Sequence, residues 1–221
     1  MVSLSSTAVK ICGITKIKQA LEIASLGVYA IGVVGVRNSK RYLPSKERRK
    51  IFRALEENFP RVARVWVIAD PNDIELSEGL NGEGRPSIIQ LHGNESIDFC
   101  KYIRAKYPLI KFWKALRISK SEDLILAKQY QDSIDAILLD SWRMKELGGT
   151  GIRLPIEWLS ECNQLKTPFW VAGGVSADWI PELLSKVKPF GVDASSKVEK
   201  SPGIKDLEKV KYLIKEVKNS I

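Results

Sequence analysis

The segment AVKICGITKIKQALEIA (8–24) joins the short apolar run AVKIC to a stretch in which apolar residues recur at helical spacing after Thr15. A short apolar run bounded by turn residues is typical of a buried parallel strand, and the helix that follows can pack back on the sheet. The same unit of strand and helix recurs along the rest of the chain. This recurrence predicts the fold.

Eight apolar runs of this kind occur in the 221 residues. They are AVKIC (8–12), YAIGVVG (29–35), ARVWVIA (63–69), SIIQL (87–91), IKFWKA (110–115), IDAILLD (134–140), PFWVAGG (168–174) and PFGVDAS (189–195). Eight alternating units predict an α/β fold in which eight parallel strands close into a (β/α)8 TIM barrel, as one domain over residues 1–221. A doubly wound open sheet also alternates strands and helices, but the GxGxxG turn of such sheets is missing and the regular repetition favours closure.

Composition narrows the class of protein. Apolar residues make up 44% of the chain, enough to form a core, which argues against a disordered protein. The chain has too few cysteines and histidines, three and one, for a zinc site of four cysteines or of two cysteines and two histidines. Three widely spaced cysteines are also a poor disulfide framework, so neither a metal nor a disulfide is expected.

No targeting or membrane segment is apparent in the sequence. The first ten residues lack a signal-peptide pattern, and the longest apolar run, VYAIGVVGV (28–36), is far short of the roughly 20 residues of a membrane span. We therefore expect a soluble, cytoplasmic protein without membrane association.

The formal net charge of +9 fits a nucleic-acid partner, an anionic small substrate or simply a solvated surface. In the C-terminal segment, lysines such as Lys209 and Lys211 alternate with acids such as Glu208, as on a solvated helix face. Aromatic residues are not interleaved with the basic runs as a base-stacking surface requires, so nucleic-acid binding is not expected.

The carboxyl ends of the strands are where barrels place catalytic groups, so the last residues of each run are the first candidates. The candidates found there are Cys12, Gln90, His92, Asp140, Gly173, Gly174, Asp193, Ser195 and Ser196. Alternation along the first run places Lys10 and Cys12 on the same face, so Cys12 points into the barrel mouth if the other face packs against helices.

Cys12 and Asp140 each have two interpretations. Cys12 could be a small buried hydrophobic residue, but its position beside Lys10 and before Gly13 gives it exposure and positive surroundings that favour a thiolate base or nucleophile. Asp140 could cap a turn, or it could act as a general acid across the mouth from Cys12. Cys100 and Cys162 lie within helical patterns and are expected to serve packing only.

Three glycine- or serine-rich stretches could bring backbone N–H groups close to an anion. They are GGTG (148–151), AGG (172–174) and DASS (193–196), although glycine also marks simple turns. The last two follow the seventh and eighth runs, where barrels commonly bind phosphate, and together they predict a phosphate site.

Arg41 and His92 are polar residues at the expected rim. Arg41, in SKRY (39–42), could be an ordinary surface arginine or could clamp a carboxylate in bidentate fashion. His92 could be a hydrogen-bonded core histidine or a substrate contact.

Seven motifs of the chain, in their order and spacing, resemble those of the phosphoribosylanthranilate isomerase family. They are KICGIT (10–15), SKRY (39–42), IQLHGNE (89–95), LLD (138–140), GGTG (148–151), AGGV (172–175) and VDASSKVEKSPGIKD (192–206). The resemblance covers nearly the whole chain from Val9 onward, and its specific parts are KICGIT and the stretch around VDASS. It implies one (β/α)8 domain that rearranges N-(5-phosphoribosyl)anthranilate to 1-(2-carboxyphenylamino)-1-deoxyribulose 5-phosphate. This Amadori rearrangement is the third step from chorismate in tryptophan biosynthesis and needs no cofactor.

The resemblance also implies a role for each candidate. Asp140 matches the general acid that protonates the furanose ring oxygen, and Cys12 matches the general base that takes the proton from sugar C2. Arg41 matches the residue near the anthranilate carboxylate, while Asp193 and His92 line the pocket. The phosphate-binding loops are matched by Gly173, Gly174, Ser195 and Ser196. The expected partner is a small phosphosugar, and a monomer and a homodimer both remain open.

The chain departs from the family pattern at three places. Lys197 stands where a glycine usually follows the paired serines, IRLPIEW (152–158) replaces a lysine and an F-D-W segment, and GVVG (32–35) lacks a common aromatic residue.

Two alternative functions remain. Another phosphosugar barrel, such as indole-glycerol-phosphate synthase or the histidine-pathway isomerase, would use a different acid and base. A basic RNA-binding barrel that retains the motifs as scaffold would show salt-sensitive RNA binding without turnover.

Overall fold

The computed structural model describes residues 7–141 and 153–220. Eight parallel strands close into a barrel in the order β1 to β8, with β8 paired to β1. The strands are β1 Ala8–Cys12, β2 Ala30–Val34, β3 Ala63–Ile68, β4 Ile88–Leu91, β5 Lys111–Ile118, β6 Ala136–Ser141, β7 Phe169–Val171 and β8 Gly191–Ala194. The predicted (β/α)8 barrel is thus confirmed.

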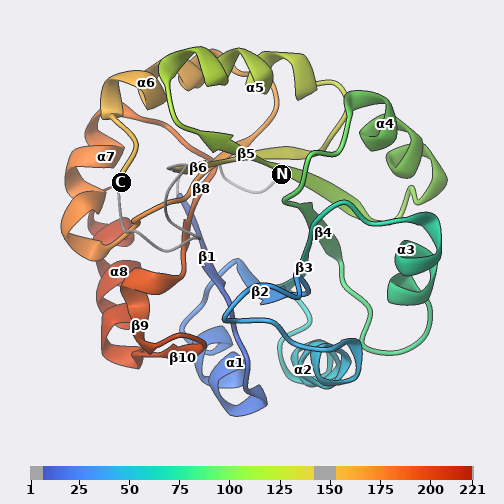
Figure 1. Ribbon diagram of the computed structural model, residues 1–221. Coiled ribbons are helices and arrows are strands. Elements are labelled where there is room, and N and C mark those ends of the chain that lie inside the picture. The colour runs from blue at the N-terminus through green and yellow to red at the C-terminus, as the bar shows by residue number, and fades with distance from the viewer. Residues whose placement is uncertain (1–6, 142–152, 221) are drawn as a thin grey trace.

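Helices surround the barrel as an outer ring (Figure 1). They are α1 Ile17–Ala24, α2 Ser45–Asn58, α3 Asp73–Leu80, α4 Ile97–Lys106, α5 Ile125–Tyr130, α6 Ile156–Glu161, α7 Ile180–Lys186 and α8 Leu207–Asn219. Short 3-10 turns lie at η1 Ser121–Leu124, η2 Cys162–Gln164, η3 Ala177–Trp179 and η4 Ser196–Val198, and the strands β9 Glu199–Ser201 and β10 Ile204–Lys205 pair antiparallel after β8. None of the described helices combines the length and apolar character that crossing a membrane requires.

Alternation along the strands separates two apolar layers. Val9 and Ile11 of β1 pack in the layer between strands and helices, whereas Cys12 faces the barrel interior, as predicted. At the amino end of the barrel, the rings of Trp113 and Trp170 lie 4.8 Å apart and fill the interior. These rings occupy the interior at the amino end, so in the described residues the carboxyl ends of the strands are the place to look for a binding site.

The structure moves several predicted boundaries. Strand β7 ends at Val171, before the predicted Gly174, because Gly173 and Gly174 have φ of 77° and 69°, outside strand geometry. Strand β5 continues to Ile118, three residues past its predicted end. Helix α1 begins at Ile17 instead of Thr15, whose hydroxyl donates to the carbonyl of Gly203 over 2.7 Å.

Candidate active site

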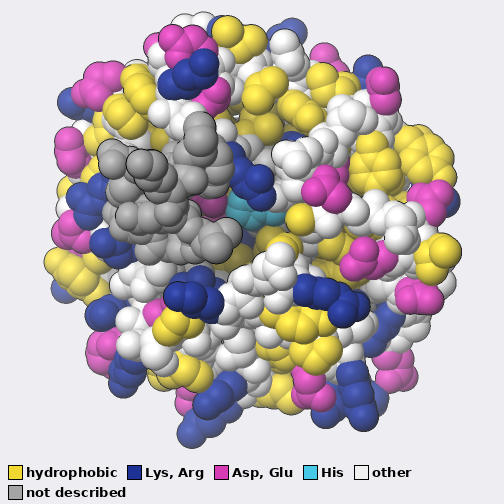
Figure 2. Space-filling view, viewed as in Figure 1, with side chains coloured by type: hydrophobic (Ala, Val, Ile, Leu, Met, Phe, Trp, Pro, Cys, Tyr) yellow, Lys and Arg dark blue, Asp and Glu magenta, His cyan; other side chains and the backbone are white. Residues whose placement is uncertain are grey.

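Site residues from five strands meet at the carboxyl end of the barrel. Cys12 is the last residue of β1, Asp140 lies near the end of β6, and Asp193 lies in β8. His92 directly follows β4, and Arg41 lies in the loop after β2. Figure 2 shows the histidine near the centre of this face, with basic and acidic side chains beside it.

Cys12 is held in a largely buried position, with 8% of its surface exposed. Its sulfur lies over Gly32 of β2, where an added Cβ would be 2.8 Å from Sγ. Burial raises the pKa of the Cys12 thiol, and this effect outweighs the opposing attraction of Lys10 and Lys205. Cys12 is therefore largely buried and not exposed as predicted, and burial disfavours its thiolate.

Lys10, next to Cys12 on the inner face, is paired with an acidic residue. Its ammonium donates to Asp193 Oδ2 over 2.7 Å, and its side chain is fully buried. Burial works against the charged ammonium, but the attraction of Asp193 and of Cys12 together raises the pKa of Lys10. Lys10 thus interacts with both the Asp193 carboxylate and the Cys12 thiol.

Asp140 lies next to His92 on the inner face of the barrel. The distance from His92 Nε2 to Asp140 Oδ2 is 3.4 Å, and the two side chains are 25% and 29% exposed. The carbonyl of His92 accepts a hydrogen bond from Arg117 Nη2 over 2.9 Å. His92 is therefore not a buried core histidine, and Asp140 faces the mouth instead of capping a turn.

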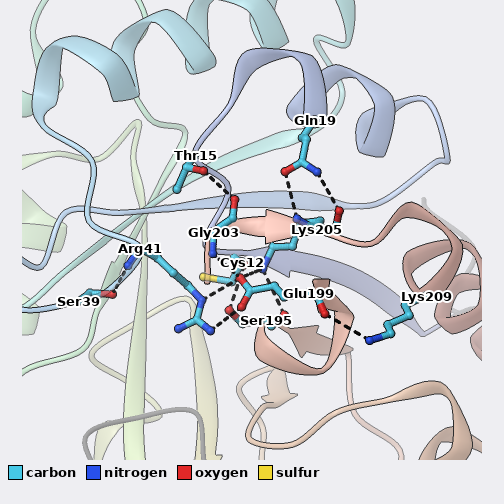
Figure 3. A network of polar contacts seen from close by, with 10 residues as sticks. All are labelled: Cys12, Thr15, Gln19, Ser39, Arg41, Ser195, Glu199, Gly203, Lys205 and Lys209. Atoms are coloured by element: carbon cyan, nitrogen blue, oxygen red, sulfur yellow. Dashed lines mark hydrogen bonds and ion pairs between the residues drawn. The ribbon is translucent and has the colours of Figure 1, made fainter. Parts of the chain in front are cut away.

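Arg41 already carries a carboxylate partner from its own chain (Figure 3). Glu199 accepts hydrogen bonds from Arg41 Nε over 2.9 Å and from Nη2 over 2.6 Å. This bidentate contact raises the pKa of Arg41. Arg41 is thus neither a free surface arginine nor fully available to a substrate.

The predicted phosphate loops lie after β7 and β8. Gly173 leaves no room for a side chain, since an added Cβ would be 2.1 Å from Ser141 Oγ. Ser195 donates its hydroxyl to the carbonyl of Cys12 over 3.1 Å, so it ties the β8 loop to the end of β1. Ser196 opens the 3-10 turn η4, and Lys197 within this turn is exposed. The GGTG motif (148–151) lies outside the described residues.

Two residues of this region were not among the predicted site residues. Glu199 and Lys205 are buried on the hairpin after β8 and form an ion pair of 2.7 Å. Both belong to the motif VDASSKVEKSPGIKD, but nothing local in that stretch indicates their partners. In addition, Gln90 Oε1 and Asp193 Oδ1 are buried and accept no hydrogen bond from any residue of 7–141 or 153–220.

The family model for N-(5'-phosphoribosyl)anthranilate (PRA) isomerase matches residues 9–216. The chain belongs to this family. It is 42% identical over 205 residues to the N-(5'-phosphoribosyl)anthranilate isomerase of Synechococcus elongatus, with 93% of each chain covered. The corresponding protein of Nostoc punctiforme is 41% identical over 209 residues, which cover 95% of this chain and 97% of that protein.

Solved structures of the same isomerase family have the same fold. The phosphoribosylanthranilate isomerase of Thermotoga maritima superposes with a TM-score of 0.85 at 30% identity and covers 96% of this chain and 99% of its own. A phosphoribosylanthranilate isomerase in complex with reduced 1-(o-carboxyphenylamino)-1-deoxyribulose 5-phosphate superposes with a TM-score of 0.82 at 30% identity, and covers 96% of this chain and 99% of its own. The family and the barrel indicated by the sequence are therefore confirmed.

Proposed function

We propose that Asp140 and Cys12 are the general acid and general base with which this chain isomerises N-(5'-phosphoribosyl)anthranilate. The observation that carries this proposal is their placement in a chain of this isomerase family. Cys12 and Asp140 lie at the carboxyl ends of β1 and β6 of one barrel. Two proton-transferring groups in different surroundings are what an aldose-to-ketose rearrangement needs.

The first step opens the sugar ring. Asp140 in its acid form donates a proton to the ring oxygen as the bond from that oxygen to C1 breaks, and the lone pair of the anthranilate nitrogen forms a Schiff base with C1. His92, 3.4 Å from the Asp140 carboxyl, is placed to orient it. General acid catalysis of this kind contributes about 10²–10⁴-fold to the rate.

The second step moves the double bond. The Cys12 thiolate takes the proton from C2, and the C–H electron pair becomes a C1=C2 double bond while the nitrogen regains its lone pair. The resulting enolamine tautomerises when C1 gains a proton and the C2 hydroxyl loses one, which gives the ketone. Protons and electrons balance in these steps without an oxidant or reductant.

The remaining candidates are proposed to bind the substrate. Arg41 faces the anthranilate carboxylate, and Asp193 and His92 line the sugar pocket. For the phosphate we propose the loop residues Gly173, Gly174, Ser195 and Ser196. The two glycines support this assignment because their positive φ allows backbone N–H groups to approach an anion closely.

We also propose that residues 1–221 act as one barrel domain in the cytoplasm, as a monomer or a homodimer, and without a nucleic-acid partner. The three cysteines support a reducing compartment because all are free and buried. For the related Thermotoga maritima isomerase, both a dimer and monomers generated from it are known.

The proposal is tested by mixing the purified protein with freshly made phosphoribosylanthranilate and following the loss of substrate fluorescence. Asp140→Asn, which keeps the shape but cannot donate a carboxylic proton, should lower kcat much more than it raises KM. A raised KM with unchanged kcat would make Asp140 a binding residue. Salt-sensitive RNA binding without any turnover would reject the isomerase assignment.

A further inference from the structure

We propose that Glu199 is a positioning residue for substrate recognition, because it fixes the direction in which Arg41 presents its free N–H groups to the substrate carboxylate. The inference rests on the proposed function, which supplies a substrate with an aryl carboxylate. It adds a residue of the β9–β10 hairpin to a site otherwise built from the ends of barrel strands.

The contact between Glu199 and Arg41 leaves one edge of the guanidinium open. A guanidinium has five N–H groups, and Glu199 accepts only two hydrogen bonds, from Nε over 2.9 Å and from Nη2 over 2.6 Å. Nη1 and the second hydrogen of Nη2 have no partner in residues 7–141 and 153–220. The Arg41 side chain is 17% exposed, so it is not sealed from a small anion.

Glu199 is itself fixed from a second side. Its side chain is 4% exposed, and its carboxylate also accepts hydrogen bonds from Lys205 Nζ over 2.7 Å and from the Gly203 backbone over 3.1 Å. The backbone N–H of Lys205 in turn donates to Gln19 Oε1 on α1 over 3.1 Å (Figure 3). The hydrogen bonds from Lys205 and Gly203 hold the carboxylate in place, so it determines the plane of the guanidinium.

The Arg41 side chain lies close enough to the proposed base, Cys12, for the two to interact electrostatically. The stem of Arg41 passes over Gly13, the residue after Cys12, where an added Cβ would be only 2.4 Å from Arg41 Cδ. A carboxylate bound to the open edge would therefore lie close to the end of β1. Bidentate recognition requires the plane of the guanidinium to be fixed, because a guanidinium rotated out of that plane donates only one N–H to the carboxylate.

Glu199 could instead serve only to hold the hairpin, through Gly203 and Lys205. The two roles differ in what a Glu199→Gln change does to ligands with and without a carboxylate. Arg41 Nε and Lys205 Nζ both donate to Oε1, whereas Arg41 Nη2 donates to Oε2. With the amide oxygen in the place of Oε1, the amide NH2 faces Nη2 and cannot accept from it, so Arg41 loses its bidentate contact and its fixed plane. A role confined to the hairpin would weaken both kinds of ligand alike or neither.

The test measures equilibrium binding of anthranilate to the substrate-free protein by fluorescence, with aniline as the same ring without its carboxylate. In Glu199→Gln we expect the Kd of anthranilate to rise about tenfold while that of aniline stays unchanged. KM for phosphoribosylanthranilate should rise by a similar factor, with kcat within about twofold of the wild type. The control is Glu208→Gln, which removes an exposed carboxylate on α8 and should change none of these values.

Two further variants decide whether Glu199 acts through Arg41. Arg41→Lys cannot form the bidentate contact, so adding Glu199→Gln to it should cause no further loss of anthranilate binding. Additive losses, equal anthranilate affinity in wild type and Glu199→Gln, or no measurable binding to the wild type would each overturn the inference. If Glu199→Gln does not fold, Glu199→Asp replaces it, since the shorter side chain cannot bridge Arg41 and Lys205. Unchanged anthranilate binding in Glu199→Asp would then overturn the inference.

The outcome is separable from that of the proposed function. A wild type that binds anthranilate through the Glu199 contact but turns over no phosphoribosylanthranilate would leave this inference standing and reject the isomerase assignment. Normal turnover with anthranilate binding that does not depend on Glu199 would reject this inference and leave the isomerase assignment standing.

Discussion

At the scale of single residues, Cys12 is the group on which the proposed reaction most depends. Cys12→Ala should lower kcat by about 10²–10⁴-fold, because a proton-transferring group is lost while the change in buried volume is small. Cys12→Ser should fail as well, since a hydroxyl is a far weaker base near neutral pH. Initial rates from substrate fluorescence, with circular dichroism as a check on folding, measure both. Either folded variant with more than about a tenth of wild-type activity would show that Cys12 is not the base.

The protonation of Cys12 predicts how activity depends on pH. The thiolate is the active base, and burial raises the pKa of this thiol above its ordinary value. The thiolate fraction therefore grows about tenfold per pH unit below that pKa. In Asp140→Asn, which has no carboxylic acid to lose its proton, the residual log kcat/KM should therefore rise with a slope near 1 between about pH 6 and about pH 8. A flat profile over this range would mean that the base is already ionised or that another group takes the C2 proton.

At the scale of elements, the turn η4 carries the main departure from the family pattern. Lys197 is exposed there, one residue after Ser196, near the proposed phosphate loop. If its ammonium lies near the phosphate, Lys197→Gly should raise KM up to roughly fivefold with kcat nearly constant, and the effect should shrink at high salt. KM values of both proteins at low and high ionic strength decide this. Identical values at low salt would show that backbone groups hold the phosphate without Lys197.

The elements themselves could be predicted because each strand of a parallel barrel is buried on both faces and reads as a short apolar run. Their ends were less predictable. Strand β7 stops at Val171 because the next glycines adopt positive φ, which the residue type permits but does not require. Strand β5 extends to Ile118 because its last three residues pair with residues 139–141 of β6. This extension depends on the neighbouring strand and not on the β5 segment itself.

The candidate site was predictable only in part. Cys12 and Asp140 were found because they end apolar runs, a local signal that the barrel turns into one shared mouth. The partner of Arg41 had no such signal, since Glu199 lies 158 residues away and is brought to it by closure of the barrel. The pairing of Lys10 with Asp193 across β1 and β8 is of the same kind, because closure of the barrel brings the two residues together.

At the scale of the whole molecule, the pair of Lys10 and Asp193 joins the first and last strands of the barrel from inside. Asp193→Asn leaves the Lys10 ammonium without a counter-charge in a fully buried position. Removing one partner of a buried ion pair costs about 3–5 kcal/mol, so the free energy of unfolding should fall by that amount in a denaturant titration.

The double variant Lys10→Met with Asp193→Asn decides whether the unpaired charge is the cause. It should recover most of the loss, because no buried charge remains and the methionine fills the lysine's space. Glu208→Gln, which breaks an exposed pair with Lys211, serves as the control and should leave the midpoint unchanged. A loss below about 1 kcal/mol in Asp193→Asn would mean that Lys10 finds another partner or water in the barrel, and closure of β1 on β8 would then rest on the backbone ladder alone.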